Sequence, residues 1–353
     1  MTDEIITRIT GQVGRITLNR PKALNALNTD MVHAMTKALL AWKDDDRVKA
    51  VVVDGKGEKG FCAGGDIRML HDSGKAGTDE AWRFWHDEYQ LNTLIKRYPK
   101  PYVALIDGIT MGGGVGISVH GSHRVAGDRT MLAMPETGIG FFPDVGGTYF
   151  LPRLEGELGM WMGLTGARLK AADSIAAGIA THYVPSDKHD DLVGALESAD
   201  LDDDGEALED ILDAHAGDPG HSQLAHTRGL IDRAFAGDDV AEMLNRMEEA
   251  KDPWSADQVK ILHKKSPTAM VVTAMAIRKG ADMEFEDVMR QELRISVRCL
   301  TGKDFYEGVR AVIIDKDNDP KWRPATLGGV GELRIERYFE PLPAEQELTF
   351  LED

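Results

Sequence analysis

Residues 101–116 read PYVALIDGITMGGGVG and join a strand, a turn and the start of a helix. The first six residues form a compact apolar run, which is typical of a strand buried on both faces. An Asp-Gly pair then provides a turn, and the triple glycine at 112–114 is expected to open a helix that reaches about His120. This stretch therefore predicts one unit of strand, glycine turn and helix.

The same order recurs on both sides of this stretch. Upstream, residues 13–18 (VGRITL) and 48–53 (VKAVVV) have the pattern of strands, and a helix is expected over residues 30–42. Downstream, short strands are expected at residues 124–126 and 132–134. Repeated strands, glycine turns and helices predict an α/β fold with crossover connections.

The charge balance restricts the partners of this protein. The 353 residues include 41 basic and 59 acidic side chains, which give a formal net charge of -18. This balance argues against a nucleic-acid partner, because phosphates require a basic surface. It permits an anionic ligand such as coenzyme A, since local basic side chains and backbone N–H groups bind phosphate on acidic proteins.

The chain shows no pattern for membrane insertion or secretion. No run approaches the ~20 continuous apolar residues that cross a bilayer, and the N-terminus lacks a basic segment followed by an apolar one. Only two cysteines occur, Cys62 and Cys299, and neither stands in a CxxC or metal-type arrangement. We therefore expect a cytoplasmic protein with no membrane partner, no disulfide and no metal, in which Cys62 is a buried filler rather than a nucleophile.

The character of the chain changes after about residue 190, so we expect two regions, residues 1–190 and 191–353. The second region is expected to be mainly helical, with helices near residues 240–249 and 285–298. The acidic run at 200–204 (DLDDD) matches a calcium loop only in part, because the final Glu is missing. A solvated loop or helix face is the expected interpretation of this run.

Two glycine-containing segments lie where strands are expected to meet helices. They are residues 61–68 (FCAGGDIR) and residues 107–116 (DGITMGGGVG). Backbone N–H groups are free at such junctions, and two of them converging from separate loops would hold an oxygen that becomes negative during acyl transfer. Taken alone, a glycine-rich turn is also a common packing device, and neither segment has the spacing of a nucleotide-phosphate loop.

A third segment, residues 134–154, adds two carboxylates. Glu136 and Asp144 each follow a proline, which restricts the local backbone. Two carboxyls in one glycine-lined cleft can take different catalytic roles, because one can be ionised while the other is protonated or hydrogen-bonded. The structural alternatives are that Asp144 caps a helix starting at Val145 and that Glu136 forms a surface ion pair.

Together the three segments resemble the crotonase (enoyl-CoA hydratase/isomerase) superfamily, and the whole chain resembles its 3-hydroxyisobutyryl-CoA hydrolase branch. Residues 20–27 (RPKALNAL) also have the superfamily's pattern, and residues 1–190 match its core, a crotonase-like spiral of repeated strand-strand-helix units. The resemblance to the branch continues through three later segments, residues 264–268 (KKSPT), 305–311 (FYEGVRA) and 321–324 (KWRP). It thus covers nearly the full length.

The resemblance implies a role for particular residues. Gly65 and Gly113 match the two oxyanion-hole amides of the family. Glu136 and Asp144 match the carboxylate pair of the hydrolase, and Glu88 matches a substrate-contacting glutamate. The further residues implied to line the coenzyme A site are Lys22, Ala23, Leu24, Ala63, Gly64 and Asp66.

The activity that the resemblance implies is hydrolysis of a short β-hydroxyacyl-CoA thioester, with 3-hydroxyisobutyryl-CoA of valine breakdown as the first choice. No metal or other cofactor is implied, because coenzyme A arrives as part of the substrate. Relatives commonly form trimers or paired trimers, so a homo-oligomer is one expected state. The long C-terminal region would instead cover or replace that interface in a monomer.

Gly116 marks a departure from the hydratases of this superfamily. Hydratases carry the first of two water-activating glutamates at this position, and they usually have glycine where Asp144 stands here. The missing pair disfavours an enoyl-CoA hydratase or isomerase of the same fold. A non-catalytic acyl-CoA-binding protein is the third hypothesis, and it would require Glu136 and Asp144 to be structural.

Overall fold

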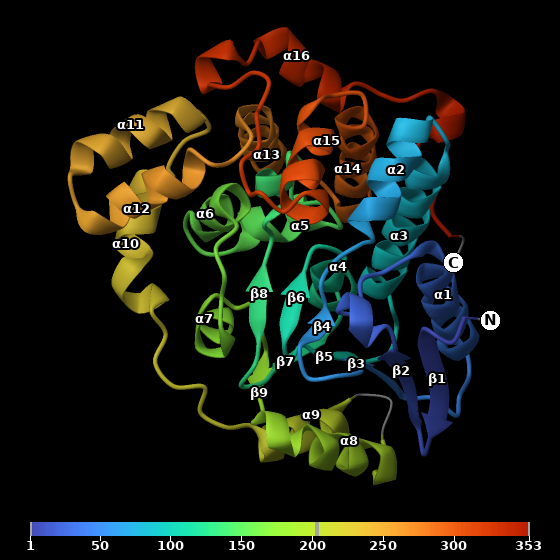
Figure 1. Cartoon of the computed structure of the whole chain (residues 1–353). Helices are drawn as coiled ribbons and strands as arrows, with labels where there is room; N and C mark the ends of the chain where they lie inside the picture. Colours follow the sequence, from blue (N-terminus) through green and yellow to red (C-terminus); the bar gives the residue numbers. More distant parts are fainter. Residues whose placement is uncertain (1, 202–204, 352–353) are drawn as a thin grey trace.

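The computed structural model describes residues 2–201 and 205–351. Its centre is a six-stranded sheet in the order β1-β2-β3-β5-β7-β9, in which β1 and β2 pair antiparallel and the other neighbours pair parallel (Figure 1). The strands span Ile5–Thr10 (β1), Val13–Leu18 (β2), Ala50–Gly55 (β3), Tyr102–Leu105 (β5), His123–Ala126 (β7) and His182–Tyr183 (β9).

A second, three-stranded parallel sheet consists of β4 (Gly60–Cys62), β6 (Ile109–Met111) and β8 (Met131–Ala133). Each of these strands directly follows a strand of the large sheet, so β3, β5 and β7 lead into β4, β6 and β8. Helices α2 (Ile67–Ala76) and α3 (Glu80–Lys96) follow β4, and α4 (Gly113–Val119) follows β6. Each turn of the chain thus gives one strand to each sheet, which confirms the predicted α/β spiral.

The large sheet is covered on both faces because side chains alternate along a strand. On β3, Val51 and Val53 belong to the main hydrophobic core, whereas Ala50 and Val52 belong to a second cluster on the opposite face. Helices α8 (His189–Ser198) and α9 (Glu206–His215) supply the other side of that second cluster, and they lie below the sheet in Figure 1. This arrangement explains the continuous apolar pattern of β3.

Helix α1 (Thr29–Lys43) shows how local sequence sets an element on the main core side. The Asn28 side chain caps it by accepting a hydrogen bond from the backbone N–H of Met31 at 2.9 Å. Met31, Met35 and Leu39 recur at helical spacing and are fully buried. The predicted helix over residues 30–42 is therefore confirmed.

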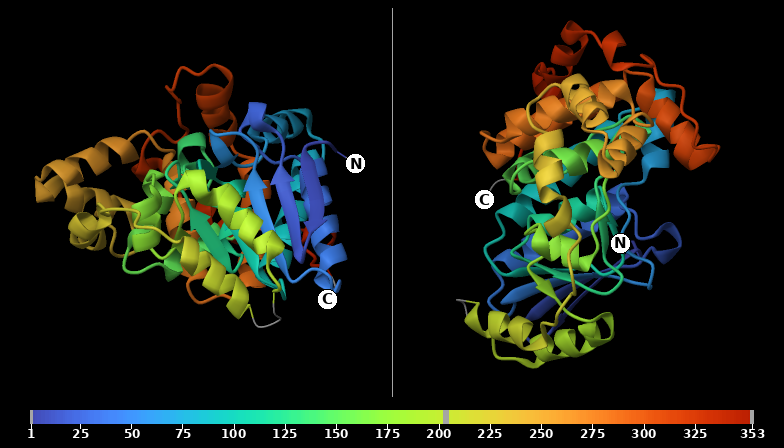
Figure 2. Two further views of the ribbon diagram at one scale, coloured as in Figure 1. Left: turned by 90° about the horizontal axis from the view of Figure 1, so that it is seen from below. Right: turned by 90° about the vertical axis from the view of Figure 1, so that its left-hand side faces the viewer.

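The C-terminal helices stand together on one side of the spiral, as the right-hand view in Figure 2 shows. They share the main hydrophobic core with the first half of the chain, so Phe285 and Phe305 pack in the same cluster as Phe61 and Phe142. The division near residue 190 stays a prediction. The helices are α10 (Leu224–Ala234), α11 (Val240–Ala250), α12 (Pro253–Leu262), α13 (Pro267–Gly280), α14 (Phe285–Cys299), α15 (Asp304–Val309) and α16 (Glu332–Glu336).

Shorter elements complete the fold. They include the 3-10 helices η1 (Pro21–Ala23) and η2 (Glu136–Ile139), helices α5 (Gly147–Phe150), α6 (Leu158–Thr165) and α7 (Ala171–Ala176), and the π-helix η5 (Arg310–Ile314). Residues 202–204 of the acidic run lie outside the described residues. Within the described part of the chain, each helix is too short or too polar to span a bilayer.

Candidate active site

A cavity of about 370 Å³ lies where the ends of β4 and β6 meet η2 and the C-terminal helices. Its volume falls in the range of small-molecule sites. Seven of the residues expected from the sequence line it: Ala63, Gly64, Gly65, Glu88, Gly113, Glu136 and Asp144. Further lining comes from Trp85, Phe84, Met111, Arg168, Lys265, Val312 and Ile313. The fold thus brings the three segments 61–68, 107–116 and 134–154 together around this cavity.

The other four expected residues are not among those that line the cavity. Lys22, Ala23 and Leu24 belong to η1 and its C-cap, and the backbone carbonyl of Leu24 accepts from Ala63 N at 3.0 Å. Asp66 caps α2 by accepting from Met69 N at 3.3 Å and also pairs with Arg20 at 2.9 Å. In this structure Asp66 fixes the loop that carries Gly64 and Gly65, and its carboxylate is engaged by these two partners.

The two glycine loops touch each other at the cavity. A Cβ placed on Gly64 would lie 3.8 Å from the backbone nitrogen of Gly113. A Cβ on Gly113 would lie only 2.5 Å from Glu88 Oε1, so any side chain here would displace the Glu88 carboxyl from its present position. The amides of Gly65 and Gly113 thus belong to adjoining loops of one cavity, an arrangement that suits an oxyanion hole.

Three carboxyls converge on the cavity and are almost fully buried. Glu88, Glu136 and Asp144 are 2%, 7% and 6% exposed. Glu88 Oε1 and Glu136 Oε2 have no hydrogen-bond partner among the described residues. A buried carboxyl oxygen without a partner is costly, and such groups in a cleft are characteristic of functional sites.

Burial changes the protonation of all three groups. It raises the pKa of Asp144 to about 7, although the hydrogen bond from Tyr89 opposes the shift. Burial, followed by the negative charge of Asp144, also raises the pKa of Glu136 and the pKa of Glu88 well above their usual range. A carboxyl with a pKa near neutrality is suited to exchange protons during a reaction at physiological pH.

Asp144 is oriented by a chain of two hydroxyl groups. The Tyr89 hydroxyl donates to Asp144 Oδ2 at 2.7 Å, and the same hydroxyl lies 2.7 Å from Ser296 Oγ. Because the Tyr89 proton is used on Asp144, the Ser296 hydroxyl donates to Tyr89. Tyr89 is on α3 and Ser296 on α14, so one helix from each half of the chain takes part.

The backbone after Asp144 is held in an unusual conformation. Val145 has a φ of 55°, which is rare for a β-branched residue, and Gly146 has a φ of 81°. Glu292 of α14 stabilises this turn by accepting from Gly146 N at 2.7 Å and from Thr148 N at 2.9 Å. The imidazole of His120 donates from Nε2 to the carbonyl of Val145 at 2.7 Å. Partners from distant segments thus maintain the turn that presents Asp144.

The strained turn also explains the absence of a side chain at Gly116. A Cβ at this position would lie 2.6 Å from Val145 Cβ and 2.9 Å from Asn92 Nδ2. The volume that the first hydratase glutamate would need is therefore filled by the residue that follows Asp144. The two-glutamate arrangement of a hydratase does not fit this cavity.

Several groups at the site were missed in the sequence. Tyr89, Ser296, Glu292 and Lys265 were not expected to be functional, although Tyr89 directly follows Glu88 and Lys265 lies in the KKSPT segment. Glu292 and Ser296 of α14 are polar residues among apolar neighbours on one helix face, and this pattern was the signal available in the sequence.

The expectation for Cys62 is confirmed, because its thiol is fully buried in β4 and burial raises its pKa to about 12.

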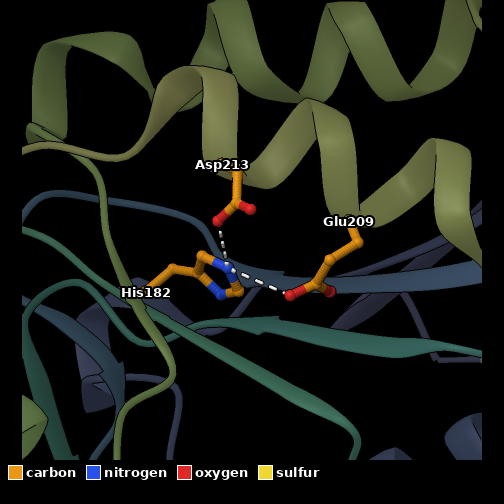
Figure 3. Close-up of side chains that lie close together, drawn as sticks. All are labelled: His182, Glu209 and Asp213. Carbon is orange, nitrogen blue, oxygen red and sulfur yellow. Dashed lines mark ion pairs between the residues drawn. The ribbon is translucent and has the colours of Figure 1, made fainter.

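Outside the cavity, His182, Glu209 and Asp213 place possible metal-ligand atoms close together (Figure 3). His182 Nε2 lies 3.5 Å from Glu209 and 3.4 Å from Asp213, which stand one turn apart on α9. His123 of β7 also contacts Glu209 at 2.7 Å. These contacts attach α9 to the edge of the sheet, and both carboxylates are largely exposed.

The fold and the cavity define a site for acyl chemistry, and comparison with known proteins supplies the family. A family model described as enoyl-CoA hydratase/isomerase matches residues 13–339. The chain belongs to the enoyl-CoA hydratase/isomerase family. A zebrafish (Danio rerio) relative named 3-hydroxyisobutyryl-CoA hydrolase, mitochondrial, is 46% identical over 96% of this chain and 90% of its own length. The human (Homo sapiens) protein of the same name is 43% identical over 96% and 89%.

Two solved structures are similar over the full chain. A carnitinyl-CoA dehydratase from Mycobacterium thermoresistibile has a TM-score of 0.92 and 45% identity and covers 99% of both chains. An enoyl-CoA hydratase from Rhodobacter sphaeroides has a TM-score of 0.90 and 40% identity and covers 99% of this chain and 100% of its own. Because each match includes the C-terminal helices, those helices belong to a fold that the three proteins share.

The expected cytoplasmic location is wrong. The curated relatives from zebrafish, chicken and human are all named as mitochondrial proteins, and each covers 96% of this chain. The expectation rested on the composition of the N-terminus and on cysteine usage. Cysteine usage does not distinguish two reducing compartments, because both keep thiols free, and the N-terminal residues were compared only with a secretory pattern.

Proposed function

We propose that this protein hydrolyses 3-hydroxyisobutyryl-CoA to 3-hydroxyisobutyrate and coenzyme A. The curated relatives that carry this activity in their names are 41–46% identical over nearly the full chain. The observation that carries the proposal is the cavity itself, in which the buried carboxyls of Glu136 and Asp144 face the adjoining loops of Gly65 and Gly113. A place in valine breakdown, which the resemblance implies, stays a prediction.

The reaction follows from these groups. The thioester carbonyl oxygen would accept hydrogen bonds from the amides of Gly65 and Gly113, which stabilise the negative charge that develops on it. Glu136 would act in one of two ways. It would remove a proton from a water that attacks the carbonyl carbon, after which the C–S bond breaks. Alternatively it would attack the carbonyl carbon itself and displace the thiolate, and water would then hydrolyse the resulting anhydride and free Glu136. Asp144 would orient Glu136 or the water and deliver a proton to the departing thiolate. Water thus supplies the hydroxyl of the acid and the proton of the thiol.

Glu88 would select the acyl group. Its Oε1 points at the Gly113 loop and has no hydrogen-bond partner among the described residues. A substrate 3-hydroxyl that donates to this oxygen would satisfy it, whereas an acyl group without the hydroxyl would leave it unpaired in the complex. The reaction as written uses no metal and no cofactor besides the coenzyme A of the substrate.

The test measures free-thiol release from 3-hydroxyisobutyryl-CoA, with hydration of crotonyl-CoA followed in parallel. Thiol release with negligible hydration would support the hydrolase. Hydration without thiol release would support the activity named for the Rhodobacter relative and would contradict our interpretation of Gly116. Tight binding without either reaction would indicate an acyl-CoA-binding protein.

A further inference from the structure

Lys265 places an amino group in the cavity that no step of the proposed reaction uses. It lies in the loop between α12 and α13 and lines the cavity together with Glu136. Within the described residues its Nζ makes no hydrogen bond and no ion pair. A lysine of the C-terminal region is thus directed, without a partner, into the space that holds the catalytic carboxyls.

The Lys265 amino group lies close to the backbone of two segments. A Cβ on Gly138 would lie 3.4 Å from Lys265 Nζ, and a Cβ on Gly166 would lie 3.3 Å from it. These distances place the amino group beside η2 and beside the C-cap of α6. Gly138 belongs to η2, the same short turn that begins with Glu136.

The loop of Lys265 is also attached to η2 on its other side. Ser266 N donates to the carbonyl of Thr137 at 3.1 Å, and the Ser266 hydroxyl donates to Asp304 at 2.6 Å. Trp322 Nε1 donates to the carbonyl of Lys264 at 3.1 Å. Contacts on both neighbours of Lys265 thus fix its backbone next to the turn of Glu136.

We propose that Lys265 is a positioning residue for thioester hydrolysis, whose ammonium group favours the charged form of the buried Glu136 carboxyl and attracts it toward the cavity. This inference rests on the proposed hydrolase function. Glu136 Oε2 is buried without a hydrogen bond among the described residues, so a nearby positive charge is the available compensation. In a cavity of low dielectric constant, such a charge acts over several ångströms without direct contact.

The titration behaviour of the two groups agrees with this geometry. Lys265 lowers the pKa of Glu136 against the larger effects of burial and of Asp144, which raise it. Burial lowers the pKa of Lys265 to about 8; Glu136 raises this value, and the neighbouring cation Arg168 lowers it. The other titratable groups that face the cavity are Glu88 and Asp144. Loss of the Lys265 proton would therefore weaken the reaction on the alkaline side.

The experiment measures kcat and KM for thiol release between pH 6 and 9.5 in Lys265→Met, Lys265→Arg and the control Lys264→Met. Lys264 is the exposed neighbour in the same loop. We expect Lys265→Met to lower kcat about 10-fold or more with little change in KM. In the pH profile of kcat, the acid limb reports ionisation of Glu136 and the alkaline limb reports loss of the Lys265 proton. In Lys265→Met the acid limb should move up by about one pH unit, and the alkaline limb near pH 8 should disappear. Lys265→Arg should keep the acid limb and lose the alkaline one, and Lys264→Met should match the wild type.

Wild-type kcat and unchanged limbs in Lys265→Met would overturn the inference, as would a lower kcat with both limbs in place, which indicates a structural role. If Lys265→Met does not fold, Lys265→Arg tests the inference: loss of its alkaline limb would support it, and an unchanged alkaline limb would overturn it. The infrared carboxyl band that is lost in Glu136→Gln reports the pKa of Glu136 without turnover. If the wild type releases no thiol, the proposed function fails, whereas this band still tests Lys265 by its shift to higher pH in Lys265→Met.

Discussion

The spiral core and the C-terminal helices contribute differently to the same cavity. The core supplies the two glycine loops and the carboxyls of Glu88, Glu136 and Asp144. The C-terminal region supplies groups that act on those residues: Ser296 and Glu292 on the Asp144 turn, and Lys265 beside η2. The difference teaches that reacting groups can be concentrated in short motifs, whereas the groups that orient them come from anywhere in the chain.

The largest expected effect is in the core. Glu136→Gln and Asp144→Asn should each lower kcat by about 10²-fold or more with modest change in substrate binding, because each removes an acid–base group. Steady-state thiol release and binding of a non-hydrolysable thioether analogue measure the two properties. Near-wild-type kcat in either variant would remove that residue from the mechanism.

The Tyr89 hydroxyl connects the two regions, and its removal should have the next largest effect. Tyr89→Phe should lower kcat about 10-fold, because Asp144 loses the donor that orients it. The same loss should raise the pKa of Asp144 further, so the step of the pH profile that reports Asp144, near pH 7 in the wild type, should move to higher pH. Ser296→Ala keeps the donor and should show a smaller change of the same sign. An unaltered pH profile in Tyr89→Phe would contradict an effect of the Tyr89 hydroxyl on the pKa of Asp144.

Glu292 tests whether the C-terminal region acts through the backbone of the Asp144 turn. Glu292→Gln exchanges one accepting oxygen for a donor and leaves a buried N–H unsatisfied, which should cost about 1–3 kcal/mol in urea unfolding. Thiol release should fall a few-fold because the turn loosens. Asp287→Asn on the same helix is the control, since its exposed side chain should stay within about 0.5 kcal/mol. Equal stability of the two variants would show that the hydrogen bonds from Gly146 and Thr148 to Glu292 do not stabilise the turn.

The smallest expected effect is on stability as a function of pH. The pKa of Asp144 rises from 3.8 to about 7 in the folded protein, so the folded state holds this proton more tightly than the unfolded chain. The resulting stability is complete below about pH 4 and is lost as pH rises through 7. Asp144→Asn does not titrate, so its Tm should gain about 6 °C on the wild type between pH 4 and 8. A constant Tm difference across this range would contradict the raised pKa.

The repeating core could be predicted because its signals are local. The run AVVV of β3 (residues 50–53) is apolar at every position and is buried on the two sheet faces, and Asn28 caps α1 three residues before its N–H partner. The site was predicted only in part. Asp66 belongs to a glycine-rich motif, yet its carboxylate caps α2 and pairs with Arg20, because a short acidic side chain at a helix start is drawn to free N–H groups.

The sequence by itself predicted the alternation of strands, glycine turns and helices, the glycines expected to line the site, and the absence of a hydratase glutamate at Gly116. Each of these is encoded within a few residues by side-chain size or apolar periodicity. Only the tertiary structure decided that the Tyr89 hydroxyl forms hydrogen bonds with Asp144, 55 residues away along the chain, and with Ser296, 207 residues away. It also decided that Val145 fills the space at Gly116. Such contacts leave no periodic pattern, because a hydrogen bond depends on where two distant segments pack and not on their spacing along the chain.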